Sequence, residues 1–265
     1  MLLRMGTILL FILLSSHCTA SRPGPTSPDA QVWNGVVRVD GALRAMFHEG
    51  QIGAAVGLDA LLPNPNLYAV GALESLAGEV TIVWGVAYLS YPTGPGQTRT
   101  ERATRATSGA ALLVSAVVQA WESVRTTRAI GFEELDAEVG RLAVAAGARI
   151  DQRVPFLVEG ELEDLRWHVV DGRRLAEGGA SHKDHLAASV QLKEKRATAI
   201  LVGFYSQTDQ GVFTHIGARS HIHCVLQEPL SSGHVDHVMV PAGAIWRFPT
   251  TANRRPGDPH TGGAS

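Results

Sequence analysis

The sequence predicts an α+β fold built from two related strand-rich halves with helices between them. Two stretches predict the halves: VGALESLAGEVTIVWGVAYLSY begins at Val70, and EGELEDLRWHVVDG begins at Glu159. Both share a Gly-x-Leu-Glu-x-Leu pattern, continue with β-branched and aromatic residues and end in a glycine turn, which indicates a duplicated strand unit. Between them, residues 132–148 place apolar side chains at spacings of three and four, as an amphipathic helix does.

Local patterns predict the other elements in order. Residues 80–84 and 167–170 are rich in β-branched and aromatic side chains and are expected to be strands. Residues 110–124 are mostly apolar and are expected to form a first helix ahead of the one at 132–148. The stretch RATAILVGFYS at 196–206 is typical of a buried strand, and a polar turn at residues 209–211 follows it.

Composition sets the boundaries of these parts. Proline, serine and glycine in SRPGPTSP are typical of a linker, and almost no apolar residue follows Phe248. We expect a signal peptide at 1–20, a linker leading into the fold at 21–40, an N-terminal α+β half at 41–150, a C-terminal half with a histidine-rich stretch at 151–247 and a flexible tail at 248–265.

The first residues have the pattern of an export signal. Arg4 supplies positive charge, Ile8 to Leu14 form an apolar run too short to span a bilayer, and Cys18-Thr19-Ala20 offers small residues for cleavage. We therefore expect an exported protein, periplasmic or extracellular, that is cleaved near Ala20. A lipid anchor on Cys18 is the less favoured alternative, because the bulky His17 stands where such processing requires a small side chain.

Overall charge and cysteine content exclude several classes of protein. A formal net charge of -2 and a pI near 6.6 provide no field that would recruit nucleic acid. No stretch reaches the roughly 18 apolar residues that a transmembrane helix needs, so the mature chain is expected to have no transmembrane span. Cleavage would leave Cys224 as the one cysteine, so stability must come from packing and not from an internal disulfide.

The stretch SHIHCVLQEPLSSGHVDH, residues 220–237, concentrates four histidines and an aspartate. Strand alternation puts His221 and His223 on one face and assigns Cys224 to the opposite, core-packing face. A polar turn at residues 227–233 would then let His234 open a second strand beside the first. Three imidazoles with one open position suit catalytic zinc, whereas four protein ligands suit a structural site, and histidines packed without a metal are the alternative.

The neighbouring polar residues receive weaker assignments. Asp236 shares a strand face with His234 and is expected beside the metal, as a group that supports a ligand or as a fourth ligand, while His237 faces away. The histidines of SHKDH at 181–185 are expected to be solvated. His48 and His215 stay unassigned.

The histidine stretch resembles the signature of the acetolactate decarboxylase family, in which H-x-H and a later G-H supply three zinc ligands. LAGEVTIVWGVAYLSY is similar to the family's L-x-G-E segment and the strand after it, and ATAILVGFYS resembles the strand before the zinc loop. The similarity runs roughly from Asp40 to Val240 and keeps the family's order of elements. It implies two related α+β halves and conversion of 2-acetolactate to acetoin and carbon dioxide.

The resemblance also implies roles for individual residues. His221, His223 and His234 would bind Zn²⁺, and Glu79 would be the carboxylate that reaches into the site and shuttles a proton; from spacing alone, Glu79 is a solvated carboxylate beside a turn. His168 stands where the family has an essential arginine. Arg166, two residues earlier, or a protonated His168 would then orient the substrate carboxylate.

This sequence departs from the family in a second place and leaves other functions open. The family has a functional glutamate near its C-terminus, and no glutamate follows Glu228 here. The main expectation is a zinc carboxy-lyase that takes a small 2-hydroxy-3-keto acid, with a homodimer as a further expectation. One alternative is an exported protein that binds zinc or a small ligand without turnover, and another is a zinc hydrolase with zinc-bound hydroxide as nucleophile.

Overall fold

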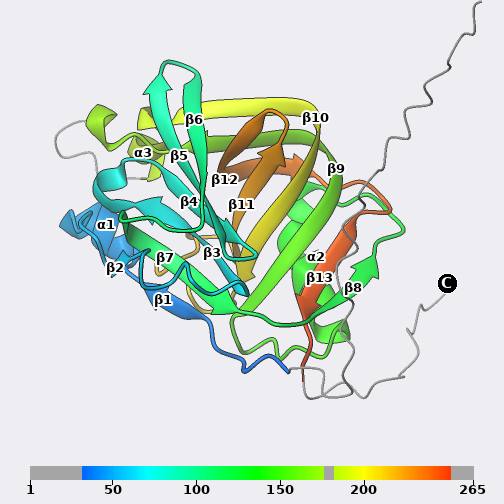
Figure 1. Ribbon diagram of the computed structural model, residues 1–265. Helices are drawn as coiled ribbons and strands as arrows, with labels where there is room; N and C mark the ends of the chain where they lie inside the picture. Colours follow the sequence, from blue (N-terminus) through cyan, green and yellow to red (C-terminus); the bar gives the residue numbers. More distant parts are fainter. Residues whose placement is uncertain (1–31, 176–181, 252–265) are drawn as a thin grey trace, which may run out of the picture. The chain divides into compact units, whose positions relative to one another are not determined.

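The computed structural model describes residues 32–175 and 182–251, which form two antiparallel β-sheets packed face to face (Figure 1). The first sheet contains β1 (Arg38–Asp40), β2 (Val56–Gly57), β3 (Leu67–Leu73), β4 (Glu79–Val83), β5 (Val86–Gly94), β6 (Gln97–Ala103) and β7 (Gly109–Val117). The second contains β8 (Trp121–Arg125), β9 (Val154–Val169), β10 (Val190–Tyr205), β11 (Ser220–Gln227), β12 (Leu230–Met239) and β13 (Ile245–Pro249). The helices are α1 (Leu43–Glu49), α2 (Phe132–Ala145) and α3 (His182–Ala188), with short 3-10 turns η1 (Glu74–Leu76) and η2 (Gly172–Arg174).

The first sheet has a buried centre and a charged edge. Its order is β1-β7-β3-β4-β5-β6, with β2 also paired to β7. Every residue of β3 and β4 is buried, whereas β6, with the sequence QTRTERA, is half exposed. Charged side chains on an edge strand oppose pairing with other chains. Glu79 begins β4, so this carboxylate enters the buried part of the sheet.

The second sheet is dominated by two 16-residue strands, β9 and β10, which pair along their whole length from Val154 with Tyr205 to Val169 with Val190. The hairpin of β11 and β12 fills the space between them, because β11 pairs with β10 and β12 pairs with β9. These four strands therefore close on themselves, while β13 and β8 extend the sheet beyond β9. The closure brings the end of β9 beside β12, where the candidate site lies.

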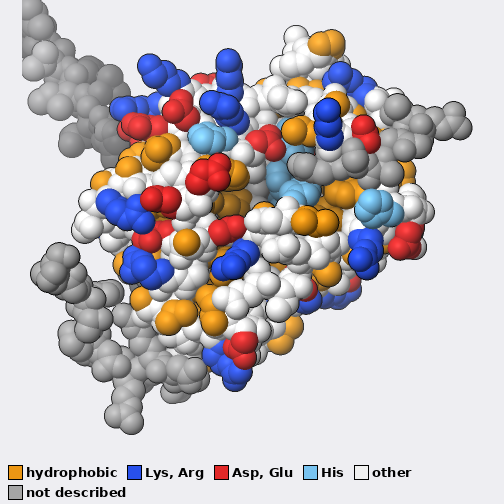
Figure 2. Space-filling model, turned by 180° about the vertical axis from the view of Figure 1, so that it is seen from behind, with side chains coloured by type: hydrophobic (Ala, Val, Ile, Leu, Met, Phe, Trp, Pro, Cys, Tyr) orange, Lys and Arg blue, Asp and Glu red, His pale blue; other side chains and the backbone are white. Residues whose placement is uncertain are grey.

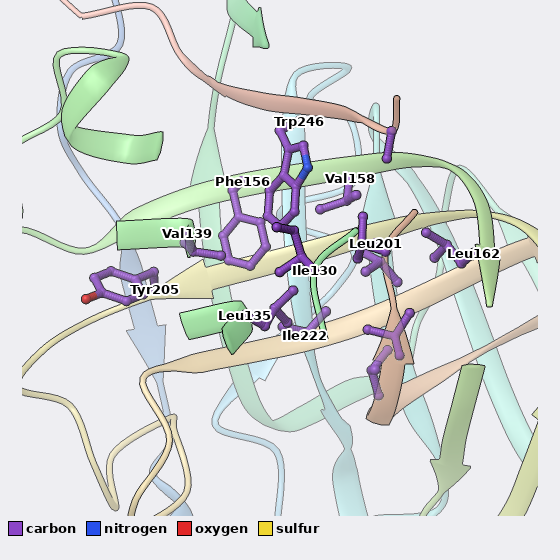
Figure 3. Close-up of a cluster of buried hydrophobic side chains, with 14 of the residues drawn as sticks. Ile130, Leu135, Val139, Phe156, Val158, Leu162, Leu201, Tyr205, Ile222 and Trp246 are labelled. Carbon is purple, nitrogen blue, oxygen red and sulfur yellow. The ribbon is translucent and has the colours of Figure 1, made fainter. Parts of the chain in front are cut away.

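Three clusters of buried apolar side chains hold these layers together. One lies between the sheets and joins Val70 of β3 to Val202 of β10. In another, α2 covers the outer face of the second sheet, with Leu135 packed in the same cluster as Trp246 (Figure 3). The third lies around Leu58, against the other face of the first sheet. Each fully buried valine or leucine stabilises the fold by about 1.5–3 kcal/mol, and the cysteine within the described ranges is not in a disulfide.

The predicted α+β class with two strand-rich halves is confirmed, but one of the two predicted helices is wrong. Residues 132–148 do contain helix α2, with its apolar stripe buried against the second sheet. Residues 110–124 instead form most of β7 and β8. A central strand buried on both faces is a continuous apolar run, and such a run lacks the alternation that separates a strand from a buried helix.

The shared hexapeptides adopt different structures, although each lies in a strand-rich half. Residues 71–76 end β3 and turn through η1, with Ser75 and Leu76 at positive φ. Residues 160–165 stay within β9. The predicted buried strand at 196–206 is confirmed by β10, whose last five residues are buried.

The structure describes only some of the segments between which the domain boundaries are expected. The signal peptide at 1–20, the linker up to residue 31 and the tail from residue 252 lie outside the described residues. Strand β13 continues through Pro249, and Phe248, the first residue of the expected tail, is fully buried. Strand β8, from the expected N-terminal half, joins the second sheet. None of the described helices is long and apolar enough to cross a membrane.

Candidate metal centre

The three histidines of the sequence motif converge on one point between the sheets. His223 of β11 lies directly opposite His234 of β12, and His221 lies two residues earlier on the same face of β11. Their candidate ligand nitrogens all lie within 4.8 Å of one another, and the Nε2 atoms of His221 and His223 are 3.2 Å apart. His223 has no exposed surface and His221 is 5% exposed. The predicted set of three histidines is therefore brought together.

The turn that creates this convergence is shorter than predicted. Strand β11 ends at Gln227 and β12 begins at Leu230, so Glu228 and Pro229 alone connect them. Gly233 belongs to β12, where a side chain would meet the His168 carbonyl oxygen at 2.4 Å. Glycine therefore lets β12 lie close against β9 directly before His234.

The geometry and charge of the cluster fit a zinc ion. Tetrahedral zinc holds imidazole nitrogens at about 2.0–2.1 Å, which places two such nitrogens roughly 3.4 Å apart. The 3.2 Å between the Nε2 atoms of His221 and His223 is slightly below this value, and the 4.8 Å limit for all three histidines is above it. Burial lowers the pKa of His221 to about 4, with a further contribution from the charge of His168. Burial also holds the pKa values of His223 and His234 well below the ordinary histidine value, so all three are neutral at pH 7 and can act as ligands.

A chain of hydroxyl groups orients His223. Its Nδ1 lies 2.9 Å from the Thr81 hydroxyl of β4, and Ser232 Oγ donates a hydrogen bond of 2.8 Å to that Thr81 oxygen. If Nδ1 carries the proton and donates to Thr81, Nε2 is left free to bind a metal. A residue of the first sheet thus positions a ligand on the second.

Glu79 lies beside this cluster and is buried. Its Oε2 is 3.7 Å from His223 Nε2, and its Oε1 accepts a hydrogen bond of 3.2 Å from the Val170 amide. Burial raises the pKa of Glu79 to about 7; the charge of His168 and the Val170 hydrogen bond oppose the shift, and Asp236 adds to it. A carboxyl group with this pKa can both donate and accept a proton near neutral pH.

His168 lies on β9 opposite His234 and is paired with a carboxylate. Its Nδ1 is 2.8 Å from Asp236 Oδ1, and its ring centre is 4.8 Å from that of His234. Burial alone would lower the pKa of His168, but the Asp236 and Glu79 carboxylates together outweigh it and raise that pKa. Asp236 thus contacts His168, which is not one of the three clustered histidines, and it is neither a member of that cluster nor hydrogen-bonded to one of its histidines among the contacts described.

Arg166 is not brought into the site. It is exposed on β9, pairs in register with His237 and does not line the cavity described below. Cys224 is fully buried on the opposite face of β11, in the core cluster with Ile222, as predicted. Burial raises the pKa of its thiol.

A cavity of about 50 Å³ opens next to the histidine cluster. Its polar lining consists of Glu79 and five histidines, namely His168, His185, His215, His221 and His234. The rest of the lining is apolar and comes from α1, β3, η1, β7, α3 and Val170, the residue directly after β9. Figure 2 shows histidine side chains at the bottom of a hollow on the face in view.

His185 and His215 are cavity residues that the sequence reasoning missed. His185 belongs to α3 and is 7% exposed, so its predicted solvation is wrong; the side chain of His182 lies outside the described residues. His215 lies in the loop between β10 and β11. The Phe47 ring of α1 contacts both imidazoles, at 4.3 Å from His185 and 6.2 Å from His215 between ring centres. Their three positions are far apart in the sequence, so no local motif joins them.

The chain resembles known proteins much more clearly in its fold than in its sequence. No protein-family model matches the chain, and no curated protein matches it. Among solved structures, a Staphylococcus aureus protein of unknown function similar to alpha-acetolactate decarboxylase superposes with a TM-score of 0.61 at 15% identity, covering 82% of this chain and 86% of that one.

Two Bacillus subtilis structures agree with this result. The alpha-acetolactate decarboxylase of strain 168 has a TM-score of 0.61 at 11% identity, covering 82% of this chain and 90% of that chain. The acetolactate decarboxylase of subspecies spizizenii has a TM-score of 0.61 at 12% identity, covering 83% and 88%. The chain described here has the fold of acetolactate-decarboxylase-like proteins, and its three clustered histidines form a site that could hold a metal ion.

Proposed function

We propose that the protein is a zinc-dependent decarboxylase that converts 2-acetolactate to acetoin and carbon dioxide. The observation that carries the proposal is the cluster of three neutral histidines with the buried Glu79 next to one cavity, in a fold like that of acetolactate decarboxylases. His221, His223 and His234 would hold the zinc. When bound, zinc would supply Lewis acidity toward the ketone and hydroxyl oxygens of the substrate.

Glu79 is the proposed proton donor. When the bond to the carboxylate carbon breaks, its electron pair stays on the carbinol carbon and is delocalised into the neighbouring carbonyl group. A protonated Glu79 then delivers the proton that forms the new C–H bond. Its burial and its raised pKa keep a share of the carboxyl groups protonated at neutral pH, as this step requires.

His168 is proposed to set the charge around Glu79, since the two groups interact and His168 is fixed by Asp236. The apolar remainder of the cavity favours the departure of an uncharged product and limits water around the reacting carbon. Arg166, exposed outside the cavity, receives no part in this scheme.

The test is acetoin formation from racemic 2-acetolactate by purified, zinc-loaded protein. The parent should form acetoin, and His221→Ala should lose both zinc and activity. Zinc content is measured by elemental mass spectrometry. His48→Ala is the matched control, because His48 is exposed on α1 and does not line the cavity. Full zinc stoichiometry in His221→Ala would contradict the metal assignment.

The two competing functions give different results in the same assay. A parent that binds zinc, forms no acetoin and hydrolyses no simple ester would be a binding protein without turnover. Ester hydrolysis without acetoin formation would identify a zinc hydrolase. A homodimer and export remain predictions beside this proposal.

A further inference from the structure

Glu79 has a direct neighbour on each adjacent strand of the first sheet, and one of the two lines the cavity. Glu79 of β4 is paired with Ala72 of β3 on one side and with Ser90 of β5 on the other (Figure 1). Directly paired residues point to the same face of a sheet, with Cβ atoms about 4.5–5.5 Å apart. Ala72 lines the cavity together with Glu79, whereas Ser90 is fully buried and contacts Thr100. The cavity therefore extends from Glu79 toward Ala72.

A β-bulge continues this row of side chains on β7. Ala72 is paired with Leu112, and the register shifts directly after this pair, so that Ala111 is the extra residue of the bulge. Bulges change the direction of side chains and are frequent beside functional sites. Ala111 and Leu112 both belong to the apolar cluster between the sheets, and Leu112 lines the cavity. Glu79, Ala72 and Leu112 thus form one continuous strip of the cavity lining.

Ala72 forms a recess in this strip. It has the smallest side chain among the described lining residues, whose other apolar members are leucine, valine, methionine and phenylalanine. Ala72 keeps 8% of its surface exposed, whereas Val70, on the same face of β3, has none and Leu112 keeps 1%. The space between the Glu79 carboxyl group and the Leu112 side chain is therefore open at Ala72.

The proposed reaction brings an apolar group to this recess. Glu79 is the proposed donor of the proton to the carbinol carbon, so that carbon must lie within reach of its carboxyl group. The hydroxyl and ketone oxygens of the substrate are assigned to the metal, and the carboxylate leaves as carbon dioxide. The alkyl substituent of the carbinol carbon is the group that neither reacts nor binds the metal. It is stabilised where it leaves water for apolar surroundings, which Ala72 and Leu112 provide beside Glu79.

We propose that Ala72 and Leu112 form the pocket for the alkyl substituent of the carbinol carbon, and that the size of the side chain at position 72 limits the size of that substituent. This inference rests on the proposed function, because it concerns the same cavity and the same class of substrate. One methylene group in an apolar pocket changes the discrimination between two ligands by about 10- to 200-fold. A larger side chain at position 72 should therefore exclude an ethyl group far more than a methyl group.

The test compares two ligands that differ by one methylene group. The zinc-loaded protein is titrated by calorimetry with 2,3-dihydroxy-2-methylbutanoate and with 2-ethyl-2,3-dihydroxybutanoate. Both have an alcohol in place of the ketone, so they cannot lose carbon dioxide by the proposed route. The affinity for the ethyl ligand divided by that for the methyl ligand is the ethyl preference.

Three variants change the volume of the recess, namely Ala72→Val, Leu112→Val and the double variant. Ala116→Val is the matched control, because Ala116 belongs to the same apolar cluster between the sheets but does not line the cavity. Zinc content and circular dichroism are measured for each protein. The formation of acetoin from 2-acetolactate by the parent is measured on the same sample.

Ala72→Val should lower the ethyl preference by about tenfold or more, with unchanged zinc content. Leu112→Val shortens the neighbouring side chain and should raise the preference, and this variant decides the test if valine at position 72 prevents folding. In the double variant the two volume changes oppose each other, so the preference should return toward that of the parent. Ala116→Val should keep the parent's preference.

Three outcomes would overturn the inference: an unchanged ethyl preference in folded Ala72→Val or, where that variant does not fold, in Leu112→Val; an equal loss in Ala72→Val and Ala116→Val; and a parent that binds neither ligand. Failure of the proposed function looks different, because the parent would then form no acetoin while its ethyl preference still fell in Ala72→Val. Acetoin formation with a preference that neither position changes would instead remove this inference and leave the proposed function standing.

Discussion

The two sides of the cavity are built by different kinds of structure. The three clustered histidines lie on paired strands with His168 and near Thr81 of the first sheet; all of these side chains are almost fully buried except His234, which is partly buried. On the opposite side, Phe47, His185 and His215 come from two seven-residue helices and a loop, in which Ile216, next to His215, is 90% exposed. Under the proposed function, the strands would hold the metal and the proton donor, and the short elements would form the opposite wall of the cavity. Substitutions on the strand side should therefore have the larger effects on metal binding and catalysis.

The largest effect is expected at Glu79, on the strand side. Glu79→Gln keeps the shape but removes the proton donor, so kcat for acetoin formation should fall by about 10²- to 10⁴-fold. Zinc content should not change, because Glu79 is not among the three clustered ligands. Steady-state kinetics and metal analysis on the same sample check this. A variant that retains most of its kcat would remove Glu79 from the mechanism.

A smaller effect is expected where the first sheet supports the metal site. Thr81→Val keeps the volume but deletes the hydroxyl that contacts His223 Nδ1. Loss of such a supporting hydrogen bond typically weakens metal affinity by about 10- to 100-fold. Competition with a fluorescent zinc chelator measures it. Thr100→Val, which breaks a similar hydroxyl contact to Ser90 in the same sheet, is the control and should leave zinc affinity unchanged; equal losses in both variants would point to general destabilisation.

The sequence was informative about the strand side because its residues are neighbours in the chain. His221, His223 and His234 lie within 14 residues, and strand alternation with one tight turn is enough to bring them together. Glu79 was found through the family resemblance, because its spacing alone indicated only a solvated carboxylate. Phe47, His185 and His215 are brought together by tertiary packing, which no local pattern contains.

Whether an element of the fold could be predicted also depended on the presence of a local pattern in its sequence. Helix α2 was predictable because one of its faces is exposed and the other is buried, which leaves a periodic signal. Strand β7 was mistaken for a helix because eight of its nine residues are buried, so its two faces carry the same kind of side chain. Arg166 shares a strand with His168, but the burial of a strand varies along its length, and alternation does not predict where it leaves the core.

A third prediction concerns the base of the loop that carries His215. Asp209 accepts hydrogen bonds from Arg153, at 2.7 and 2.8 Å, and from Ser206 at 2.6 Å, at the base of the β10–β11 loop. Asp209→Asn should lower the free energy of unfolding at pH 7 by about 1–2 kcal/mol, a value reduced because Arg153 is partly exposed. Urea unfolding measures it.

The effect of Asp209 should depend on pH in a defined direction. Hydrogen bonding by Arg153 holds the pKa of Asp209 below its ordinary value, although burial opposes this shift. The stabilisation is therefore present above the unfolded-state pKa of about 3.9 and is lost as the pH falls toward the folded-state pKa. The difference between parent and Asp209→Asn should shrink below about pH 4. Asp151→Asn, whose partner Arg149 is on the surface, should show no measurable difference at either pH.

The smallest effect is expected on the face of β11 that points away from the metal. Cys224→Ala should leave zinc content and acetoin formation unchanged and cost about 1 kcal/mol of stability, because the thiol packs in the core beside Ile222. Burial raises the pKa of this thiol, so in a Cys18→Ser background iodoacetamide should label it only after unfolding. Rapid labelling of the folded protein, or zinc loss from Cys224→Ala, would mean that the two faces of β11 are not separated as the strand alternation requires. Together with Thr81→Val, this variant tests whether the two histidines of β11 and Cys224 point to opposite faces of that strand.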